Sequence, residues 1–165
     1  MRKRSRLGLL WFILTIAWMA FIFMKSDEPY SVQDVKPALG SVVSEEQLLR
    51  YIPRWEFYYG GSLVSWREPY HFVEFFIRKG GHVAEFALLT VLLILTLSAR
   101  VRSKGLVAAG SGLIAVLYAC SDEWHQTFVP GRTGHLADVA VDSIGVVLVL
   151  AAYLIVVAIR RRRVR

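Results

Sequence analysis

Apolar residues along this chain are grouped into four long runs, separated by segments in which charged and polar residues dominate. The runs cover about residues 7–24, 80–99, 105–121 and 139–159. A helix rises ~1.5 Å per residue and the hydrocarbon core of a bilayer is ~30 Å thick, so runs of this length suit membrane crossing. The pattern predicts an all-α membrane protein with four transmembrane helices, in direct contact with the lipid bilayer.

The first run follows a basic segment, MRKRSR, as the apolar part of a signal peptide would. It is longer than the usual ~7–15 residues of such a part, and no small-x-small cleavage pattern precedes Lys25. We therefore expect this run to be retained as the first transmembrane helix.

The segment between the first two runs, residues 25–79, is too long for a simple connector. Ser44-x-x-Gln47 before two leucines is typical of a helix start, and Gly60-Gly61 predicts a break. Part of this segment should therefore be helical.

The end of this segment, PYHFVEFFIR at residues 69–78, places Phe72, Phe75 and Phe76 at helical spacing. We expect a short helix lying in the membrane interface before the second span, with an exposed loop as the alternative. No internal repeat and no linker divides the chain, which indicates one domain over residues 1–165.

Charge is distributed unevenly along the chain, which has 20 basic and 13 acidic residues. Twelve of the basic residues and no acidic residue lie in three segments, at residues 2–6, 100–104 and 160–165. The positive-inside rule predicts that all three are cytoplasmic, so both termini face the cytoplasm and residues 25–79 are external. Because these charges lie directly beside membrane-length runs, they favour topology and anionic-lipid contact, and we exclude nucleic acid as a partner.

Small residues form a stripe along the third run, as on a closely packed helix face. The stripe consists of Ala108, Gly112, Ala115 and Ala119. Steps of three and four residues extend it to Asp122 and Gln126. The fourth run has the same alternation at Asp138, Asp142, Gly145, Val149 and Ala152.

In the second run, Lys79, His82 and Glu85 recur every three residues on one helix face. All these polar positions lie at the predicted external end of their helices. We therefore expect convergence of six side chains: His82, Glu85, Asp122, Gln126, Asp138 and Asp142. Pro130-Gly131 predicts a chain reversal that carries Arg132 over the mouth of this site.

These residues form three motifs with fixed spacing. They are Lys79-x-x-His82-x-x-Glu85-Phe86, Asp122-Glu123-x-x-Gln126-x-x-x-Pro130-x-Arg132 and Asp138-x-x-x-Asp142-x-x-Gly145. Together with the preceding helix, they closely resemble the VanZ-like family of small bacterial membrane proteins. The resemblance implies a multi-pass protein of the cell membrane and cell envelope, in some members linked to teicoplanin resistance, a form of antibiotic resistance. One departure is Asp142, where the family often has Asn.

The first functional hypothesis is an enzyme in which His82, Glu85 and Asp122 are catalytic, as general acids and bases. Substrate binding would fall to Lys79, Glu123, Gln126, Arg132, Asp138 and Asp142. Lys79 and Arg132 suit an anionic headgroup, such as a lipid-linked envelope precursor or a phospholipid. Because Ser121 and Cys120 lack a placed base, no covalent nucleophile is expected.

Two alternatives stay open, and two others are disfavoured. The same pocket suits a binding protein without turnover or antibiotic role, and single polar residues suit structural contacts between helices. A metal site would use His82, Glu85, Asp122 and Asp138, but no zinc spacing supports it, so no metal or cofactor is predicted. Ion passage is disfavoured because the cytoplasmic halves, such as residues 88–97 and 146–157, have almost no ionisable residues.

Overall fold

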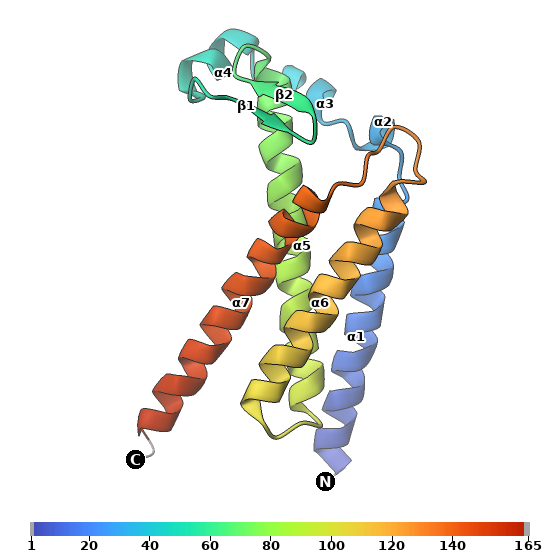
Figure 1. Cartoon of the computed structure of the whole chain (residues 1–165), viewed down its shortest axis with the longest axis vertical. Coiled ribbons are helices and arrows are strands. Elements are labelled where there is room, and N and C mark those ends of the chain that lie inside the picture. Colours follow the sequence, from blue (N-terminus) through green and yellow to red (C-terminus); the bar gives the residue numbers. More distant parts are fainter. Residues whose placement is uncertain (1, 164–165) are drawn as a thin grey trace.

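The computed structural model describes residues 2–163, with side chains from residue 6 onward. Four long helices dominate it: α1 (Arg2–Ser26), α5 (Pro69–Ser98), α6 (Lys104–Gln126) and α7 (Leu136–Arg163) (Figure 1). All four are long and apolar enough to cross a membrane, which confirms the predicted number of spans. Each extends beyond its apolar run. The basic side chains of Arg2, Lys3, Arg4 and Arg165, used in the topology argument, lie outside the described residues.

The segment between α1 and α5 forms a small folded cap at one end of the bundle. Its helices are α2 (Tyr30–Gln33), α3 (Lys36–Val42) and α4 (Glu45–Tyr51). The predicted helix start is confirmed, since Ser44 and Gln47 form a reciprocal capping box at α4. The segment is thus partly helical, as expected.

A β-hairpin that the sequence analysis did not predict completes the cap. Its antiparallel strands are β1 (Glu56–Tyr59) and β2 (Ser62–Ser65), with Tyr59 opposite Ser62. The predicted break at Gly60-Gly61 is the two-residue turn, and both glycines have positive φ, +57° and +83°. Such a turn favours glycine because a Cβ atom destabilises this backbone region.

The prediction of a separate interface helix at residues 69–78 is wrong. These residues are the first turns of α5, which continues without interruption to Ser98. The aromatic stripe is explained by the hairpin, because Phe57 and Tyr59 pack edge-to-face against Phe75 with ring centroids 5.5 and 5.1 Å apart. Part of the apolar face therefore packs against the hairpin, while Phe76 stays 43% exposed.

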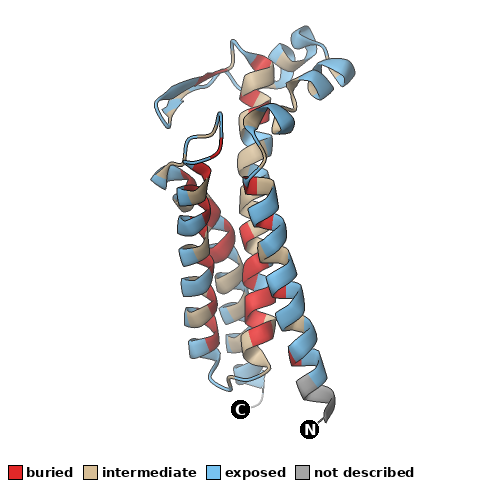
Figure 2. Ribbon diagram, turned by 90° about the vertical axis from the view of Figure 1, so that its right-hand side faces the viewer, coloured by how far each residue is buried: buried red, intermediate tan, exposed pale blue. Residues whose placement is uncertain are grey.

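The helices pack around a core on the facing sides of the bundle (Figure 2). This core consists of Ile22, Phe86, Leu89, Leu93, Ala115, Ala119 and Val146. Helices α5 and α7 approach most closely at Gly145, where an added Cβ would lie 2.1 Å from the carbonyl oxygen of Val83. The predicted stripe on α7 does not extend to Ala152, which is exposed, because this end of α7 splays away from the other helices (Figure 1).

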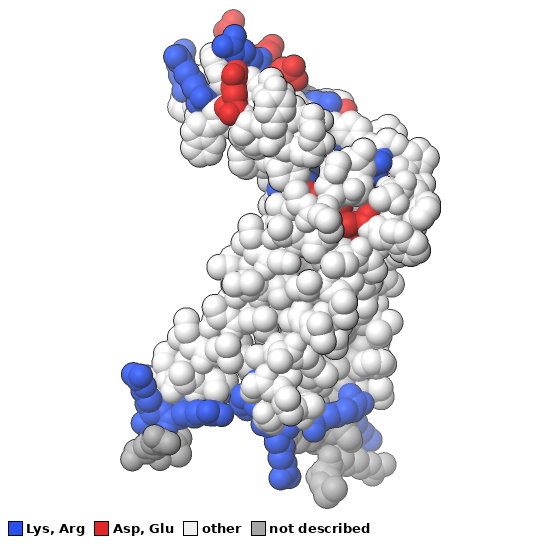
Figure 3. Space-filling view, in the orientation of Figure 1, with Lys and Arg blue, Asp and Glu red and all other residues white. Residues whose placement is uncertain are grey.

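Charged residues mark the two ends of the bundle, and an apolar band lies between them (Figure 3). The start of α1, the connection between α5 and α6 and the end of α7 lie at the same end (Figure 1). This end carries Lys and Arg, and the acidic residues gather at the opposite end with the cap (Figure 3). The side of the membrane that each end faces stays a prediction.

Candidate functional site

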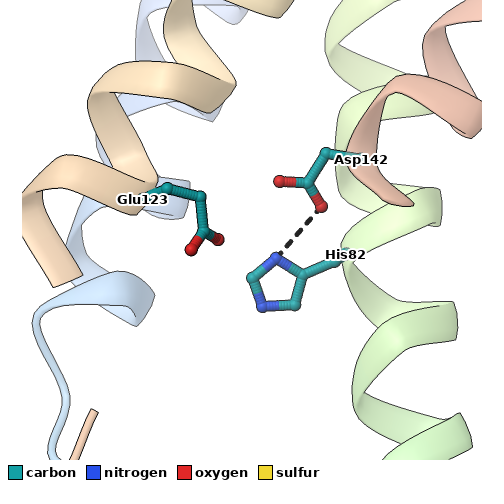
Figure 4. A group of neighbouring side chains, drawn as sticks. All are labelled: His82, Glu123 and Asp142. Carbon is teal, nitrogen blue, oxygen red and sulfur yellow. Dashed lines mark ion pairs between the residues drawn. The ribbon is translucent and has the colours of Figure 1, made fainter. Parts of the chain in front are cut away.

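Three helices bring His82, Glu123 and Asp142 together below the cap (Figure 4). Nδ1 of His82, on α5, lies 3.3 Å from Oδ1 of Asp142, on α7. Glu123 reaches the same point from α6, and one ligand-type atom from each of the three residues lies within 4.8 Å of the other two. Asp142 is completely buried, whereas the His82 side chain is 22% exposed. Sequence spacing had grouped His82 with Asp142 but had not placed Glu123 beside them.

Glu123 is oriented by two neighbouring groups. Its Oε2 atom accepts a hydrogen bond of 3.1 Å from the backbone N–H of His135, and Oε1 accepts one of 3.4 Å from Nε2 of Gln126. Gly134 permits this approach, because an added Cβ would lie 2.0 Å from the Glu123 carbonyl oxygen. The loop before α7 therefore packs tightly against the end of α6.

Asp122 and Glu85 lie beside this group rather than within it. Asp122 is buried and its Oδ2 atom accepts a hydrogen bond of 2.8 Å from Nε2 of Gln126, while Oδ1 has no partner. Glu85 is half-buried and borders the same hollow as Asp122 and His82. Of the four residues considered for the metal alternative, only His82 belongs to the group with ligand atoms close together.

Lys79 is engaged by Asp138 within the protein. Its Nζ atom lies 2.5 Å from Oδ1 of Asp138, which also accepts a hydrogen bond from the Tyr59 hydroxyl. Burial, followed by this hydrogen bond, raises the pKa of Tyr59, so the phenol stays protonated and donates. The hypothesis that Lys79 grips a headgroup is thus less well supported than the one for Arg132, because its charge is already paired.

Arg132 follows the predicted turn, whose Gly131 has a φ of +74°. Its guanidinium donates to the Lys25 carbonyl oxygen at 3.3 Å and to Oε1 of Gln33, while its Nε atom is buried without a partner. Burial lowers the pKa of Arg132, and the neighbouring positive charge of Arg78 lowers it further. The positive charges of Arg78 and Arg132 are therefore close enough to repel each other.

A second polar group, missed by the sequence analysis, links the cap to α5. Glu74 is 2% exposed and accepts a hydrogen bond of 2.9 Å from the Tyr30 hydroxyl. Lys36 lies 3.7 Å from the same carboxylate, and the guanidinium of Arg78 lies over the Tyr30 ring at 4.9 Å. The four-residue spacing of Glu74 and Arg78 was the available signal, but the sequence analysis assigned neither residue a partner.

Two hollows meet at this site, with volumes of about 270 and 440 Å³. Arg78, His82 and Arg132 line both of them. The smaller hollow also has Glu74, Lys79 and Asp138 in its wall, and the larger one opens between the ends of α1, α5 and α6. Both hollows are therefore lined by basic and acidic side chains together.

Comparison with known proteins gives one match. A family model described as VanZ/LLP1 matches residues 11–157, which is most of the chain. Searches among curated proteins and among solved structures found no match.

Proposed function

The chain belongs to the VanZ/LLP1 family, and from this premise we propose that it is a multi-pass membrane protein that binds an anionic lipid or cell-envelope headgroup. The observation that carries the proposal is the pair Arg78 and Arg132, which line the same two hollows. Among the described residues, neither forms an ion pair with a carboxylate. Two guanidinium groups that repel each other favour an anion bound between them.

The size and depth of the site support a headgroup as the ligand. A hollow of about 270 Å³ is near the lower end of small-molecule sites, which suits a headgroup better than a whole lipid. The polar residues lie where the apolar band of the bundle ends (Figure 3). A headgroup bound there can leave its hydrocarbon chain in the membrane.

We propose that this end faces outward, as the basic residues near the opposite end favour. Reporter fusions at Lys36 and Lys104 should then be external and cytoplasmic, respectively. A cysteine at Ser62, in a variant without Cys120, should react with an impermeant thiol reagent in intact cells. A cytoplasmic signal at Lys36 would reverse the proposed orientation.

Binding itself is tested with purified protein in phosphatidylcholine nanodiscs, titrated with short-chain phosphatidic acid. The wild type should prefer phosphatidic acid to short-chain phosphatidylcholine, and Arg78→Gln or Arg132→Gln should each weaken binding about tenfold, as expected for a charge-assisted hydrogen bond. Arg50→Gln, on exposed α4, is the matched control and should retain wild-type affinity. Equal affinity for both lipids, or no loss with either pocket variant, contradicts the proposal.

Catalysis is a second candidate, favoured by the pairing of His82 with buried Asp142. A carboxylate beside Nδ1 orients an imidazole for general acid–base work, and His82 borders both hollows. In this candidate active site, His82, Glu85 and Asp122 would transfer protons. The substrate would be bound by Lys79, Glu123, Gln126, Arg132, Asp138 and Asp142.

Glu85→Gln separates turnover from binding, because proton transfer needs the ionisable carboxyl group. Turnover should fall about 100-fold or more, whereas headgroup affinity should be largely retained.

We also propose that this member lowers teicoplanin susceptibility. Wild type and Glu85→Gln, expressed at matched membrane levels, should then differ in susceptibility and in their lipid-linked precursors by mass spectrometry. An unchanged precursor profile with a tolerated Gln contradicts catalysis, and unchanged susceptibility with wild type contradicts the antibiotic role.

A further inference from the structure

We propose that His82, Glu123 and Asp142 bind one divalent transition-metal ion. The three side chains come from three different helices and point toward a common centre (Figure 4). Nδ1 of His82 and Oδ1 of Asp142 are 3.3 Å apart. Two ligands in a tetrahedral site with bonds of ~2.0–2.1 Å are separated by about 3.4 Å, so this edge already has the required length. Glu123, with all three ligand atoms within 4.8 Å, needs only a small side-chain movement.

A second observation, independent of the distances, is that the buried Asp142 carboxylate lacks hydrogen-bond partners. Its carboxylate is completely buried, and neither Oδ1 nor Oδ2 has a hydrogen-bond partner. Nδ1 of His82 also lacks an aligned partner, although it is at ion-pair distance from Oδ1. A buried carboxylate without hydrogen bonds is strongly unfavourable unless a cation lies against it.

The local charge balance also favours a cation when both carboxyl groups are ionised. Glu123 and Asp142 bring two negative charges to one point, and a protonated His82 would neutralise only one of them. Lys79 cannot supply the second charge because Asp138 holds it at 2.5 Å. A divalent ion with a neutral imidazole neutralises both carboxylates.

The donor set selects the class of metal. One imidazole nitrogen with two carboxylates suits Zn²⁺, Mn²⁺ or Fe²⁺, whereas Mg²⁺ and Ca²⁺ prefer oxygen ligands alone. The hydrogen bonds to Glu123 from Gln126 and the His135 backbone orient the ligand, as groups behind metal ligands commonly do.

Three protein ligands leave at least one coordination position free, and His82 lines both hollows. The proposal of an ion site depends only on the three side chains and not on the proposed function. A role in which the free position coordinates a phosphate oxygen of the headgroup rests on the proposed function. Arg78 and Arg132, which line the same two hollows as His82, would then hold the remaining oxygens.

The site is tested with the purified full-length protein, prepared with a tag that contains no histidine. After chelation and dialysis, Zn²⁺, Mn²⁺, Mg²⁺ and Ca²⁺ are titrated separately, and bound metal is measured by mass spectrometry. We expect one Zn²⁺ or Mn²⁺ per chain and weaker Mg²⁺ and Ca²⁺ binding. Asp142→Asn and Glu123→Gln should each reduce affinity at least tenfold. Glu46→Gln, on exposed α4 and outside both hollows, is the control and should retain wild-type affinity.

No stoichiometric binding by wild type, or unchanged affinity in both ligand variants, overturns the proposal. Thermal unfolding with and without the ion identifies misfolded variants. A folded variant still unfolds cooperatively, and the ion raises the melting temperature only where the site is intact. Phosphatidic acid titrations of metal-loaded and chelated protein distinguish failure of the metal-site proposal from failure of the headgroup-binding proposal. Ion binding without headgroup binding supports the metal site and contradicts the proposed function. Headgroup binding by a protein that binds no ion does the reverse.

Discussion

The two halves of this helix bundle bury polar groups in opposite ways. In the half that contains the start of α1 and the end of α7, the buried polar side chains among the described residues are uncharged. Thr15 and Thr96 hydrogen-bond to each other at 2.9 Å, and Thr90 donates to the Phe86 carbonyl oxygen. We call this the apolar half. In the polar half, next to the cap, the buried side chains include five carboxylates, those of Glu74, Asp122, Glu123, Asp138 and Asp142.

The difference is clearest in the buried atoms without partners. Among the described residues, those of the apolar half are the hydroxyl groups of Ser111 and Tyr153. In the polar half they include atoms of four charged residues, Glu74, Asp122, Arg132 and Asp142. An unpaired buried charge costs several kcal/mol, and the apolar half demonstrates that these helices pack without one. These buried polar atoms without partners are what supports the proposal that the polar half binds a ligand.

The largest expected effect comes from the contact that joins the two halves. In Gly145→Ala, the new Cβ would lie 2.1 Å from the Val83 carbonyl oxygen, so α5 and α7 must separate. We expect loss of most folded protein, measured by size-exclusion chromatography in detergent. Gly80→Ala is the control, because an added Cβ there meets nothing within 4 Å. Normal yield of Gly145→Ala would contradict the close packing on which the site depends.

Asp142→Asn tests whether the polar half trades stability for function. The amide removes an uncompensated buried charge, so the melting temperature of the metal-free protein should stay equal or rise. Headgroup binding or turnover should nevertheless fall about tenfold or more, as found for groups that orient or hold a ligand. A variant that melts well below wild type yet retains its function would show that Asp142 is structural.

Lys79→Met tests whether this lysine supports the fold rather than the ligand. Removing it leaves the buried Asp138 carboxylate with Tyr59 alone, so stability should fall by about 1–3 kcal/mol. The additional change Asp138→Asn should restore much of this loss, because the unpaired charge is then absent. Phosphatidic acid affinity should change little throughout. A tenfold loss of affinity without loss of stability would return Lys79 to the binding residues.

The smallest effect is expected in the apolar half. Thr96→Val removes the hydrogen bond to Thr15 without changing the side-chain shape, and such bonds contribute about 0.6 kcal/mol in membranes. Unfolding should be slightly easier, whereas headgroup and metal binding should match wild type. A functional loss comparable to that of Asp142→Asn would remove the distinction between the halves.

Periodicity predicted the helices but not what covers them. The apolar runs established four spans, and the stripe from Ala108 to Ala119 indicated which face of α6 is buried. The aromatic stripe before His82 was misinterpreted, because a helical stripe is the same whether lipid or a hairpin covers it. That hairpin forms through pairing of β1 with β2, and its contact with Phe75 joins residues distant in sequence.

The candidate site was predictable in its location but not in its pairings. The steps of three and four residues indicated that His82, Asp122 and Asp142 lie on buried faces at one end. They did not reveal that Glu123 lies near His82. Glu123 is oriented by the loop at Gly134, which packs against α6, and spacing within a helix does not contain that contact. Likewise, the pairing of Lys79 with Asp138 depends on the angle between α5 and α7, which no spacing within one helix contains.

The central claim is that Arg78 and Arg132 bind one anion in the polar half. A double-mutant cycle with Arg78→Gln and Arg132→Gln, read as phosphatidic acid affinity in nanodiscs, tests it most directly. Two groups that hold the same headgroup should be coupled by about 0.5 kcal/mol or more, so the double variant should not show the sum of the single losses. Strictly additive losses, or no loss in either single variant, would contradict the claim.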